Sequence, residues 1–256
     1  MKILFLGTCA CEPSPRFMTD LKDRFDKDVR RTSAMMIDED LLVDCGMHVL
    51  DSLRIAAKDS EKIKNVLVTH LHCDHFNAEH LSVIAKGRQI PLKVFVREDA
   101  NAPEIDGVEY VRMKPFTKYE VQSGVFVTGL PANHDPRVAP QHLLIEKDGR
   151  KLYYGCDGAW MLHDSFKFLK KARLDMAIFD CTCGNYAGDF RAGEHNSIPM
   201  LGLLMPSLKT IHAIDDETRL YITHLAPGLH ESHEETERIV AEIGMRVAYD
   251  GLELEL

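Results

Sequence analysis

One six-residue motif, His-x-His-x-Asp-His at residues 70–75, carries four side chains that can bind a metal. Imidazole and carboxylate groups are the ligands that zinc, manganese and iron accept in proteins. With 13 histidines in 256 residues, chance rarely produces this spacing. The motif therefore predicts a metal site, and the alternative is a degenerate relic without metal. The four side chains are His70, His72, Asp74 and His75.

The motif lies between a predicted strand and a predicted helix. Residues 65–69 form an apolar, β-branched run that is typical of a buried strand, and Asn77 can cap an amphipathic helix over 77–86. A loop between two such elements can be held in one conformation. We therefore expect the motif's side chains to be fixed in space.

Four further segments place an acid or a histidine directly after a predicted strand. These residues are Asp44, His134, Asp157 and His224. Each alone is a weak signal, because a strand-end aspartate is usually a cap or turn former and a lone histidine is usually a surface residue. Their occurrence at successive strand ends indicates a shared site. The other histidines, including His142, fit no ligand pattern and are expected at the surface or in the core.

Composition and charge narrow the classes of function. A 45% apolar content is ample for a large core, and a net charge of −9 argues against a protein that mainly coats nucleic acid or binds anionic membranes. No apolar run is long enough to span a membrane, and the apolar start of the chain is too short for a signal peptide. Seven cysteines, an odd number, fit a reducing compartment, so we expect a cytoplasmic protein.

Strand patterns occur in groups, with helical patterns between the groups. Strands are predicted at 2–7, 34–37, 40–44, 65–69, 92–96, 108–112, 119–121, 125–130, 141–146, 151–156, 175–180, 219–223 and 245–249. Helices are predicted at 46–58, 77–86, 159–172, 197–207 and 231–243, and hairpin turns at 147–150 and 250–251. This order predicts two sheets packed face to face with helices outside, in a single domain over residues 1–256.

The segment 12–33 is the longest stretch without clear strand character. It is rich in Pro, Arg, Asp and Lys, and it is expected to be either a lid over the site or a solvated surface loop. Its basic residues include Arg16, Lys27, Arg30 and Arg31. Arginine binds phosphate through a bidentate fork, so one of them could recognise an anionic substrate, and the alternative is solvated surface charge.

Taken in order, these segments resemble the metallo-β-lactamase superfamily over nearly the whole chain. The resemblance implies an α+β fold, a four-layer αβ/βα sandwich of two mixed sheets with a two-metal site at one edge. The ligands it implies for one metal are His70, His72 and His134. Those for the other are Asp74, His75 and His224, with Asp157 bridging the pair. Asp44 matches an acid that orients a ligand histidine without binding metal.

The resemblance also implies the cofactors and the chemistry. Two divalent ions are expected, zinc first, with manganese or iron as alternatives because the same ligands accept them. Such a pair lowers the pKa of a shared water, so that a metal-bound hydroxide exists at neutral pH, and Asp74 would hold it by a hydrogen bond. The superfamily hydrolyses amides, lactones, thioesters and phosphodiesters, so the fold does not select the substrate.

Two features favour a phosphodiester. Asp180 ends a predicted strand and His195 follows in Glu-His-Asn-Ser, which is similar to an acid and a histidine in the tRNA 3′-processing nucleases and other phosphodiesterase branches. There the histidine contacts phosphate and can protonate the leaving alkoxide; the alternative is that His195 only caps the helix beginning near Asn196. The segments 176–181, 220–224 and 247–254 resemble the phosphoribosyl 1,2-cyclic phosphate phosphodiesterase family.

The chain departs from that family at its cysteines. The family carries a Cys-x-Cys-x-x-Cys cluster and a later histidine that hold a separate structural zinc. Here the first loop offers only Cys9 and Cys11, and Leu225-Ala226-Pro227 follows His224, so we expect this zinc to be missing. Whether the pairs 9/11 and 181/183 bind a further metal stays open, and the alternative is that they are small buried or loop residues.

We therefore predict a dinuclear metal-dependent hydrolase, with a small cyclic or nucleotide-like phosphodiester as its substrate. The catalytic residues expected are Asp74, Asp180 and His195. The alternatives are a lactone or thioester hydrolase with the same metals, or a metal-binding sensor or chaperone without turnover. We expect no membrane partner and no nucleic acid, since the long arm of the tRNA nucleases is not evident. The sequence allows a homodimer without indicating one.

Overall fold

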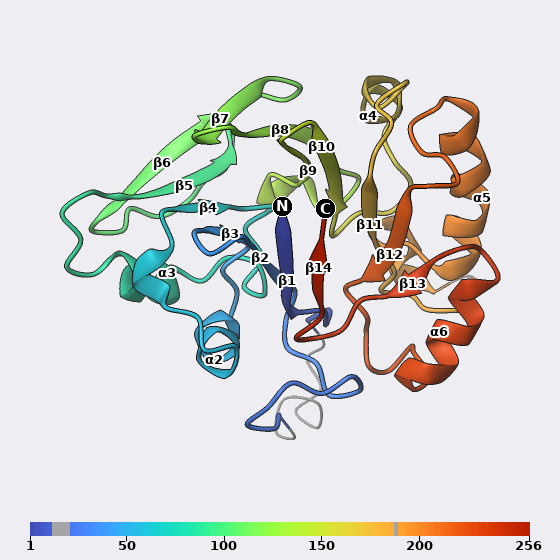
Figure 1. Ribbon diagram of the computed structural model, residues 1–256, viewed down its shortest axis with the longest axis horizontal. Coiled ribbons are helices and arrows are strands. Elements are labelled where there is room, and N and C mark those ends of the chain that lie inside the picture. Colours follow the sequence, from blue (N-terminus) through green and yellow to red (C-terminus); the bar gives the residue numbers. More distant parts are fainter. Residues whose placement is uncertain (12–20, 187–188) are drawn as a thin grey trace.

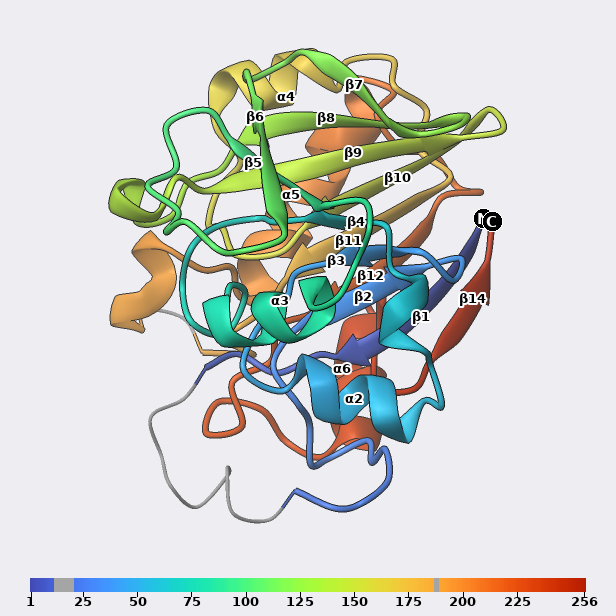
Figure 2. The same cartoon turned by 90° about the vertical axis from the view of Figure 1, so that its left-hand side faces the viewer.

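The computed structural model describes residues 1–11, 21–186 and 189–256. Two seven-stranded sheets pack face to face, and helices cover the outer side of each sheet (Figure 1). A quarter turn of the molecule shows the same layers from the side of α2 and α3 (Figure 2). The predicted sandwich of two mixed sheets with helices outside is confirmed. No helix in the described ranges is long and apolar enough to cross a membrane.

The first sheet is built from the first half of the chain and the last strand. Its order is β14 (Glu253–Glu255), β1 (Lys2–Gly7), β2 (Ala34–Ile37), β3 (Leu41–Val43), β4 (Asn65–Leu67), β5 (Leu92–Arg97) and β6 (Val108–Met113). The pairs from β14 to β3 are antiparallel and those from β3 to β6 are parallel.

The second sheet repeats this mixture in the second half of the chain. Its order is β13 (Arg246–Val247), β12 (Arg219–Thr223), β11 (Met176–Asp180), β10 (Arg150–Gly155), β9 (Gln141–Lys147), β8 (Val125–Pro131) and β7 (Lys118–Gln122). The pairs from β13 to β10 are parallel, and those from β10 to β7 are antiparallel.

In the described part of the chain, five helices pack on the outer faces of the sheets. They are α2 (Val49–Ile55), α3 (Ala78–Ala85), α4 (His163–Phe168), α5 (Ile198–Thr210) and α6 (His233–Ala241). The first two cover the first sheet and the other three cover the second (Figure 1). The described residues also form three short 3-10 helices: η1 (Ser60–Lys62), η2 (Pro136–Val138) and η3 (Phe190–Gly193).

The strands alternate between two cores because successive side chains point to opposite faces of a sheet. In β1, Ile3 and Phe5 enter the core between the sheets, whereas Leu4 and Leu6 pack under α2 and α3. The second sheet separates its residues in the same way between the central core and the layer under α5 and α6. Because both faces of each sheet are covered, the sequences of the strands are continuous apolar runs.

Two predicted elements differ from the structure, and one strand was not predicted. The helix predicted over 159–172 is only α4, because the residues before it form a loop in which Ala159 N–H donates to Asn133 O at 3.0 Å. The turn predicted at 250–251 is present, since Leu252 N–H donates to Tyr249 O at 3.0 Å, but it does not connect a hairpin, because the chain there leaves the second sheet and β14 pairs with β1 of the first. The prediction also lacked β14, a strand of three residues.

The predicted lid is described only in part. Residues 12–20, with Arg16, lie outside the described residues. In the remainder, Arg31 is buried and pairs with Asp51 at 2.7 Å, and Arg30 donates to Thr8 Oγ1 at 2.8 Å. These two guanidinium groups are used inside the fold, so the idea that they contact a substrate is wrong.

Candidate metal centre

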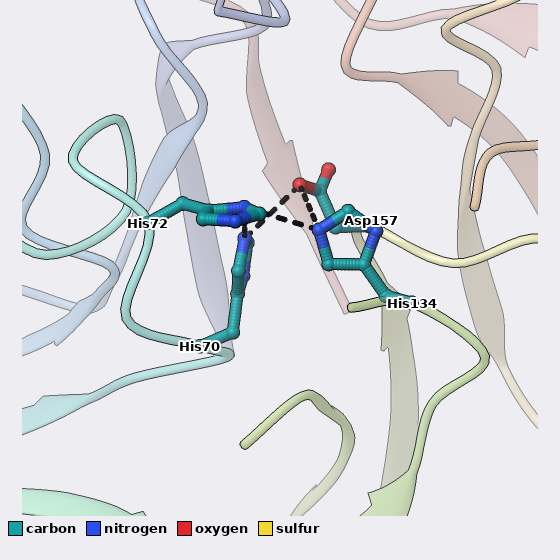
Figure 3. A group of neighbouring side chains, drawn as sticks. All are labelled: His70, His72, His134 and Asp157. Carbon is teal, nitrogen blue, oxygen red and sulfur yellow. Dashed lines mark hydrogen bonds and ion pairs between the residues drawn. The ribbon is translucent and has the colours of Figure 1, made fainter. Parts of the chain in front are cut away.

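The first group of site residues comes from both sheets. His70 and His72 lie in the loop after β4, His134 follows β8, and Asp157 follows β10 (Figure 3). His70 Nε2 and His134 Nε2 lie 3.0 and 3.1 Å from His72 Nδ1. Asp157 Oδ2 lies 3.2 Å from His70 Nε2 and 3.7 Å from His134 Nε2. Four potential ligand atoms therefore face one point.

A second group lies directly beside the first and shares Asp157. His75 Nε2 lies 3.2 Å from His224 Nε2 and 3.3 Å from Asp74 Oδ2. Asp157 Oδ1 lies 2.8 Å from His224 Nε2, while its Oδ2 belongs to the first group. One carboxylate therefore contacts both groups, as a bridging ligand would.

The spacing of these atoms fits a small divalent cation. In a tetrahedral zinc site with bonds of about 2.0–2.1 Å, neighbouring ligand atoms are about 3.3–3.4 Å apart. The nitrogen and oxygen pairs of the two groups are separated by 2.8–3.7 Å. The set of imidazoles and carboxylates could therefore hold metal ions.

The hydrogen bonds of the histidine nitrogens that point away from the centre show which nitrogens are free to bind a metal. His75 Nδ1 lies 2.7 Å from Asp44 Oδ2, and His134 Nδ1 lies 3.3 Å from Glu194 O. These nitrogens must donate to the oxygens they face, which assigns the proton to Nδ1 and leaves a lone pair on Nε2. Inside each group these lone pairs point at one another and repel, and a bound cation would remove that repulsion.

Asp44 orients the motif without reaching its centre. It is fully buried, and its Oδ1 accepts from Thr69 N–H at 2.8 Å while its Oδ2 accepts from His75 Nδ1. Burial raises the pKa of Asp44, against the opposing effect of His75 and Thr69. The carboxylate therefore fixes both the strand end before the motif and the tautomer of His75.

Strand ends position the site through unusual backbone conformations. Asp44, Asp157 and His224 each follow a strand and have positive φ angles of 63°, 55° and 58°. Non-glycine residues rarely adopt this left-handed conformation, and such residues cluster at functional sites. The carboxyl ends of the parallel strands meet at the edge where the two sheets face each other, which is where ligands bind in open α/β sheets.

Burial and the neighbouring charges shift the pKa values of the clustered side chains. Burial and His75 lower the pKa of His70 to about 3. Burial raises the pKa of Asp157, but His224 and His75 outweigh it and hold this pKa well below its usual value. Burial lowers the pKa of His224, but Asp157 and its neighbours raise it well above its usual value. The buried carboxylates thus favour positive charge at the centre, for which protons and metal ions compete.

Asp180 and His195 form a pair at the edge of this cluster. His195 Nδ1 lies 2.7 Å from Asp180 Oδ2. The His195 ring stacks on His224 with centroids 5.4 Å apart, and its centroid lies 5.1 Å from that of His134. The helix α5 is capped by Ser197, whose Oγ accepts from Met200 N–H at 3.4 Å, so the alternative that His195 is merely the cap is wrong.

Two positioning residues were missed in the sequence. The Thr182 hydroxyl lies 2.7 Å from His224 Nδ1 and 3.1 Å from His195 Nδ1, and so links the pair to the cluster. His142, expected to have no role in the site, lies 3.2 Å from Asp157 O through its Nε2. A threonine two residues after a strand-end acid is common and does not indicate a site. His142 lies within a predicted strand, where nothing distinguishes it from a structural residue.

A search with protein-family models matches residues 39–224 to the β-lactamase superfamily domain. The chain belongs to the metallo-β-lactamase superfamily. No curated protein sequence matches it. Residues 39–224 include every side chain of the two metal groups, so the superfamily domain contains the whole candidate centre.

Solved structures of the metallo-β-lactamase fold align over the full chain. The protein YhfI from Bacillus subtilis is 18% identical, with a TM-score of 0.77 and coverage of 100% of this chain and 98% of that one. Zn²⁺-bound PqqB from Methylobacterium extorquens is 18% identical, with a TM-score of 0.70 and full coverage of both chains. A diphosphatase from the PhnP family is 17% identical, with a TM-score of 0.72 and coverage of 100% and 96%. At these identities the likeness shows the fold.

Proposed function

We propose that this protein is a dinuclear metal-dependent phosphodiesterase that acts on a small cyclic or nucleotide-like substrate. One metal would be held by the first group of site residues and the other by the second, with Asp157 shared. Metals bound there would supply a water that ionises near neutral pH and positive charge beside the reacting phosphoryl group. The remaining steps fall to the side chains.

The observation that carries the proposal is the position of His195. Its Nδ1 is bonded to Asp180, and in the described part of the chain its Nε2 has no hydrogen-bond partner. Its ring faces His134 of one group and His224 of the other. A proton on Nε2 is therefore available beside the place where a substrate would span both groups, and Asp180 stabilises the charged imidazole.

Leaving-group chemistry explains why such an acid points to a phosphodiester. Cleavage of an alkyl phosphodiester expels an alkoxide, a strong base that needs a proton as the bond breaks. Asp74 Oδ2 forms a triangle with His75 Nε2 and His224 Nε2, at 3.3 and 3.5 Å from them, where it can orient the attacking water. Asp74 would thus serve the attacking water, and His195 would serve the leaving group.

Exposed aromatic side chains on the two loops beside the site support a nucleotide-like substrate. Trp160 follows Asp157 by three residues and is 43% exposed, and Phe190 in η3 is 88% exposed. Asn196 Nδ2 donates to Gly158 O at 2.7 Å and joins the two loops. Stacking of a base on an aromatic ring contributes about 1–3 kcal/mol. Replacement of Trp160 by Ala is therefore expected to raise KM for a cyclic nucleotide several-fold.

A comparison of leaving groups tests the proposal. The zinc- or manganese-loaded protein and its His195→Asn variant are assayed with 2′,3′-cyclic AMP, which expels an alkoxide, and with bis(p-nitrophenyl) phosphate, which expels a weakly basic phenolate. We expect the variant to lose about a hundredfold in kcat/KM with the first substrate and less than about tenfold with the second. His212→Asn, at an exposed turn, is the matched control.

The same assays separate the alternatives. A lactone and a thioester are included beside the two phosphodiesters. If these are the better substrates and His195→Asn leaves their hydrolysis intact, the protein is an acyl hydrolase. If the metal-loaded protein turns over none of the four, the phosphodiesterase proposal is wrong and a metal-binding role replaces it.

A further inference from the structure

Two cysteines lie together at the entrance to the metal centre. Cys11 is four residues beyond the end of β1, and Cys73 is inside the motif between His72 and Asp74. Of the seven cysteines in the chain, these two are exposed and the other five are buried. The two exposed thiols are therefore far apart in sequence, and the fold brings them together.

The proximity of the two thiols is direct. The sulfur atoms of Cys11 and Cys73 and a carboxylate oxygen of Asp74 all lie within 4.8 Å of one another. A disulfide requires a sulfur–sulfur distance of about 2.05 Å, so the two sulfur atoms must come closer through a change of side-chain rotamer or a local backbone shift.

Hydrogen bonds of the fold hold each cysteine in place independently. The backbone before Cys11 is fixed because Ala10 N–H donates to Leu225 O at 3.1 Å, next to His224. Cys73 lies in a tight turn, in which His75 N–H donates to His72 O at 3.0 Å. The encounter of the two thiols is therefore a property of the folded chain.

We propose that Cys11 and Cys73 form a reversible disulfide when the protein meets a peroxide. With hydrogen peroxide, one sulfur attacks an oxygen atom, the S–O bond forms as the O–O bond breaks, and a sulfenic acid and one water result. The other thiol attacks that sulfur, the S–S bond forms as the S–OH bond breaks, and a second water leaves. Two electrons pass from the sulfurs to the peroxide, and a dithiol reductant reverses the change.

The bridge is expected to disturb the second metal group. Cys73 directly precedes Asp74, whose Oδ2 lies 3.3 Å from His75 Nε2. Drawing Cys73 toward Cys11 moves the backbone that carries this carboxylate. The oxidised protein should therefore bind metal more weakly. This consequence rests on the proposed role of Asp74 as a ligand, whereas the disulfide itself does not.

Peptide mapping of the oxidised full-length protein tests the disulfide. The metal-loaded protein is treated with a small excess of hydrogen peroxide, its remaining thiols are alkylated, and it is digested with trypsin. Cys73 falls in the peptide 65–86 with no other cysteine, and Cys11 falls in 3–16 together with Cys9. We expect these two peptides to be linked, with the loss of two hydrogen atoms and recovery on reduction with dithiothreitol.

Two serine variants show which cysteine of the peptide 3–16 forms the disulfide. Cys11→Ser should abolish the linked peptide, whereas Cys9→Ser should keep it. Sulfinic or sulfonic acids at Cys11 and Cys73 without a link, a bond between two molecules, or thiols that react only after denaturation would each overturn the proposal.

A separate measurement follows the consequence for metal binding. Treatment with peroxide should lower the amount of metal bound to the wild-type protein, and dithiothreitol should restore it. The metal content of Cys11→Ser should not change. If the linked peptide forms and the metal content stays constant, the disulfide stands and the effect on Asp74 is refuted. Since mapping needs no substrate, its outcome is independent of whether the protein is a phosphodiesterase.

Discussion

Replacement of Asp44 by Asn isolates the effect of one buried carboxylate on the metal centre. Both oxygens of Asp44 accept hydrogen bonds, Oδ1 from Thr69 N–H at 2.8 Å and Oδ2 from His75 Nδ1 at 2.7 Å. Asparagine has one oxygen and one NH₂ group. Because asparagine tolerates the left-handed conformation found at this position, φ 63°, the backbone should not change.

Either orientation of the new amide leaves one conflict. If its NH₂ faces Thr69 N–H, two donors meet in a buried place, at a cost of about 1–3 kcal/mol in the free energy of unfolding. If its NH₂ faces His75, the imidazole proton must move to Nε2, which removes the lone pair from the metal position. Loss of such a partner typically lowers metal affinity by about 10–100-fold.

The assay is competition for zinc with a chromophoric chelator, beside urea unfolding of the metal-free protein. We expect Asp44→Asn to bind at least one zinc about 10–100-fold more weakly. Asp38→Asn is the matched control, because Asp38 also has a positive φ, 53°, but lies away from the centre in the turn between β2 and β3. Equal zinc affinity in wild type and Asp44→Asn would refute the reasoning.

Three further predictions follow from other contacts. Asp38 accepts from Lys147 Nζ at 2.8 Å across the two sheets, and although burial raises its pKa, this bond and that from the Lys2 backbone lower it overall. Stabilisation by Asp38 should therefore be present above pH about 4 and be lost as the pH falls through its lowered pKa. The stability difference between wild type and Asp38→Asn in urea unfolding should be below about 1 kcal/mol near pH 7 and should shrink as the pH falls through the lowered pKa of Asp38; a difference that does not change with pH would contradict this. In Gly46→Ala, the new Cβ would lie 1.7 Å from Asp74 O, so we expect a lower unfolding temperature and weaker zinc binding. Gly193→Ala serves as the control, because its new Cβ has no atom within 4 Å and its φ is not positive; both variants should be compared with wild type by calorimetry. Addition of zinc to chelator-treated protein should raise the unfolding temperature in proportion to RT ln(1 + [Zn]/Kd), and no rise with saturating zinc, manganese or iron would argue against a metal centre.

Apolar patterning was sufficient to predict nearly all strands and their approximate ends. The central strands are buried on both faces, so their sequences are continuous apolar runs bounded by polar residues. The prediction failed where tertiary contacts replaced local preference. The residues before α4 have a helical composition, but they form a loop because Asp157 adopts a left-handed backbone and Ala159 bonds to Asn133. The short β14 exists only because β1 offers an unpaired edge.

The candidate centre was predictable to the extent that its residues end strands. His134, Asp157 and His224 could be selected because each follows an apolar run, and the structure brings all three to the motif at 70–75. Their convergence depends on how the two sheets pack, which no local pattern encodes. The contacts of Thr182 and His142, and the approach of Cys11 to Cys73, depend on that packing in the same way.

The division of the site between the sheets has a consequence for biosynthesis. The first half of the chain supplies His70, His72, Asp74 and His75, and the second half supplies the bridging carboxylate and the last two imidazoles. A nascent or cleaved polypeptide that lacks the second sheet has no complete coordination sphere for either ion. Tight metal binding should thus begin only after both halves of the chain have folded and packed together. Bound metal should then stabilise the complete fold against separation of the two halves.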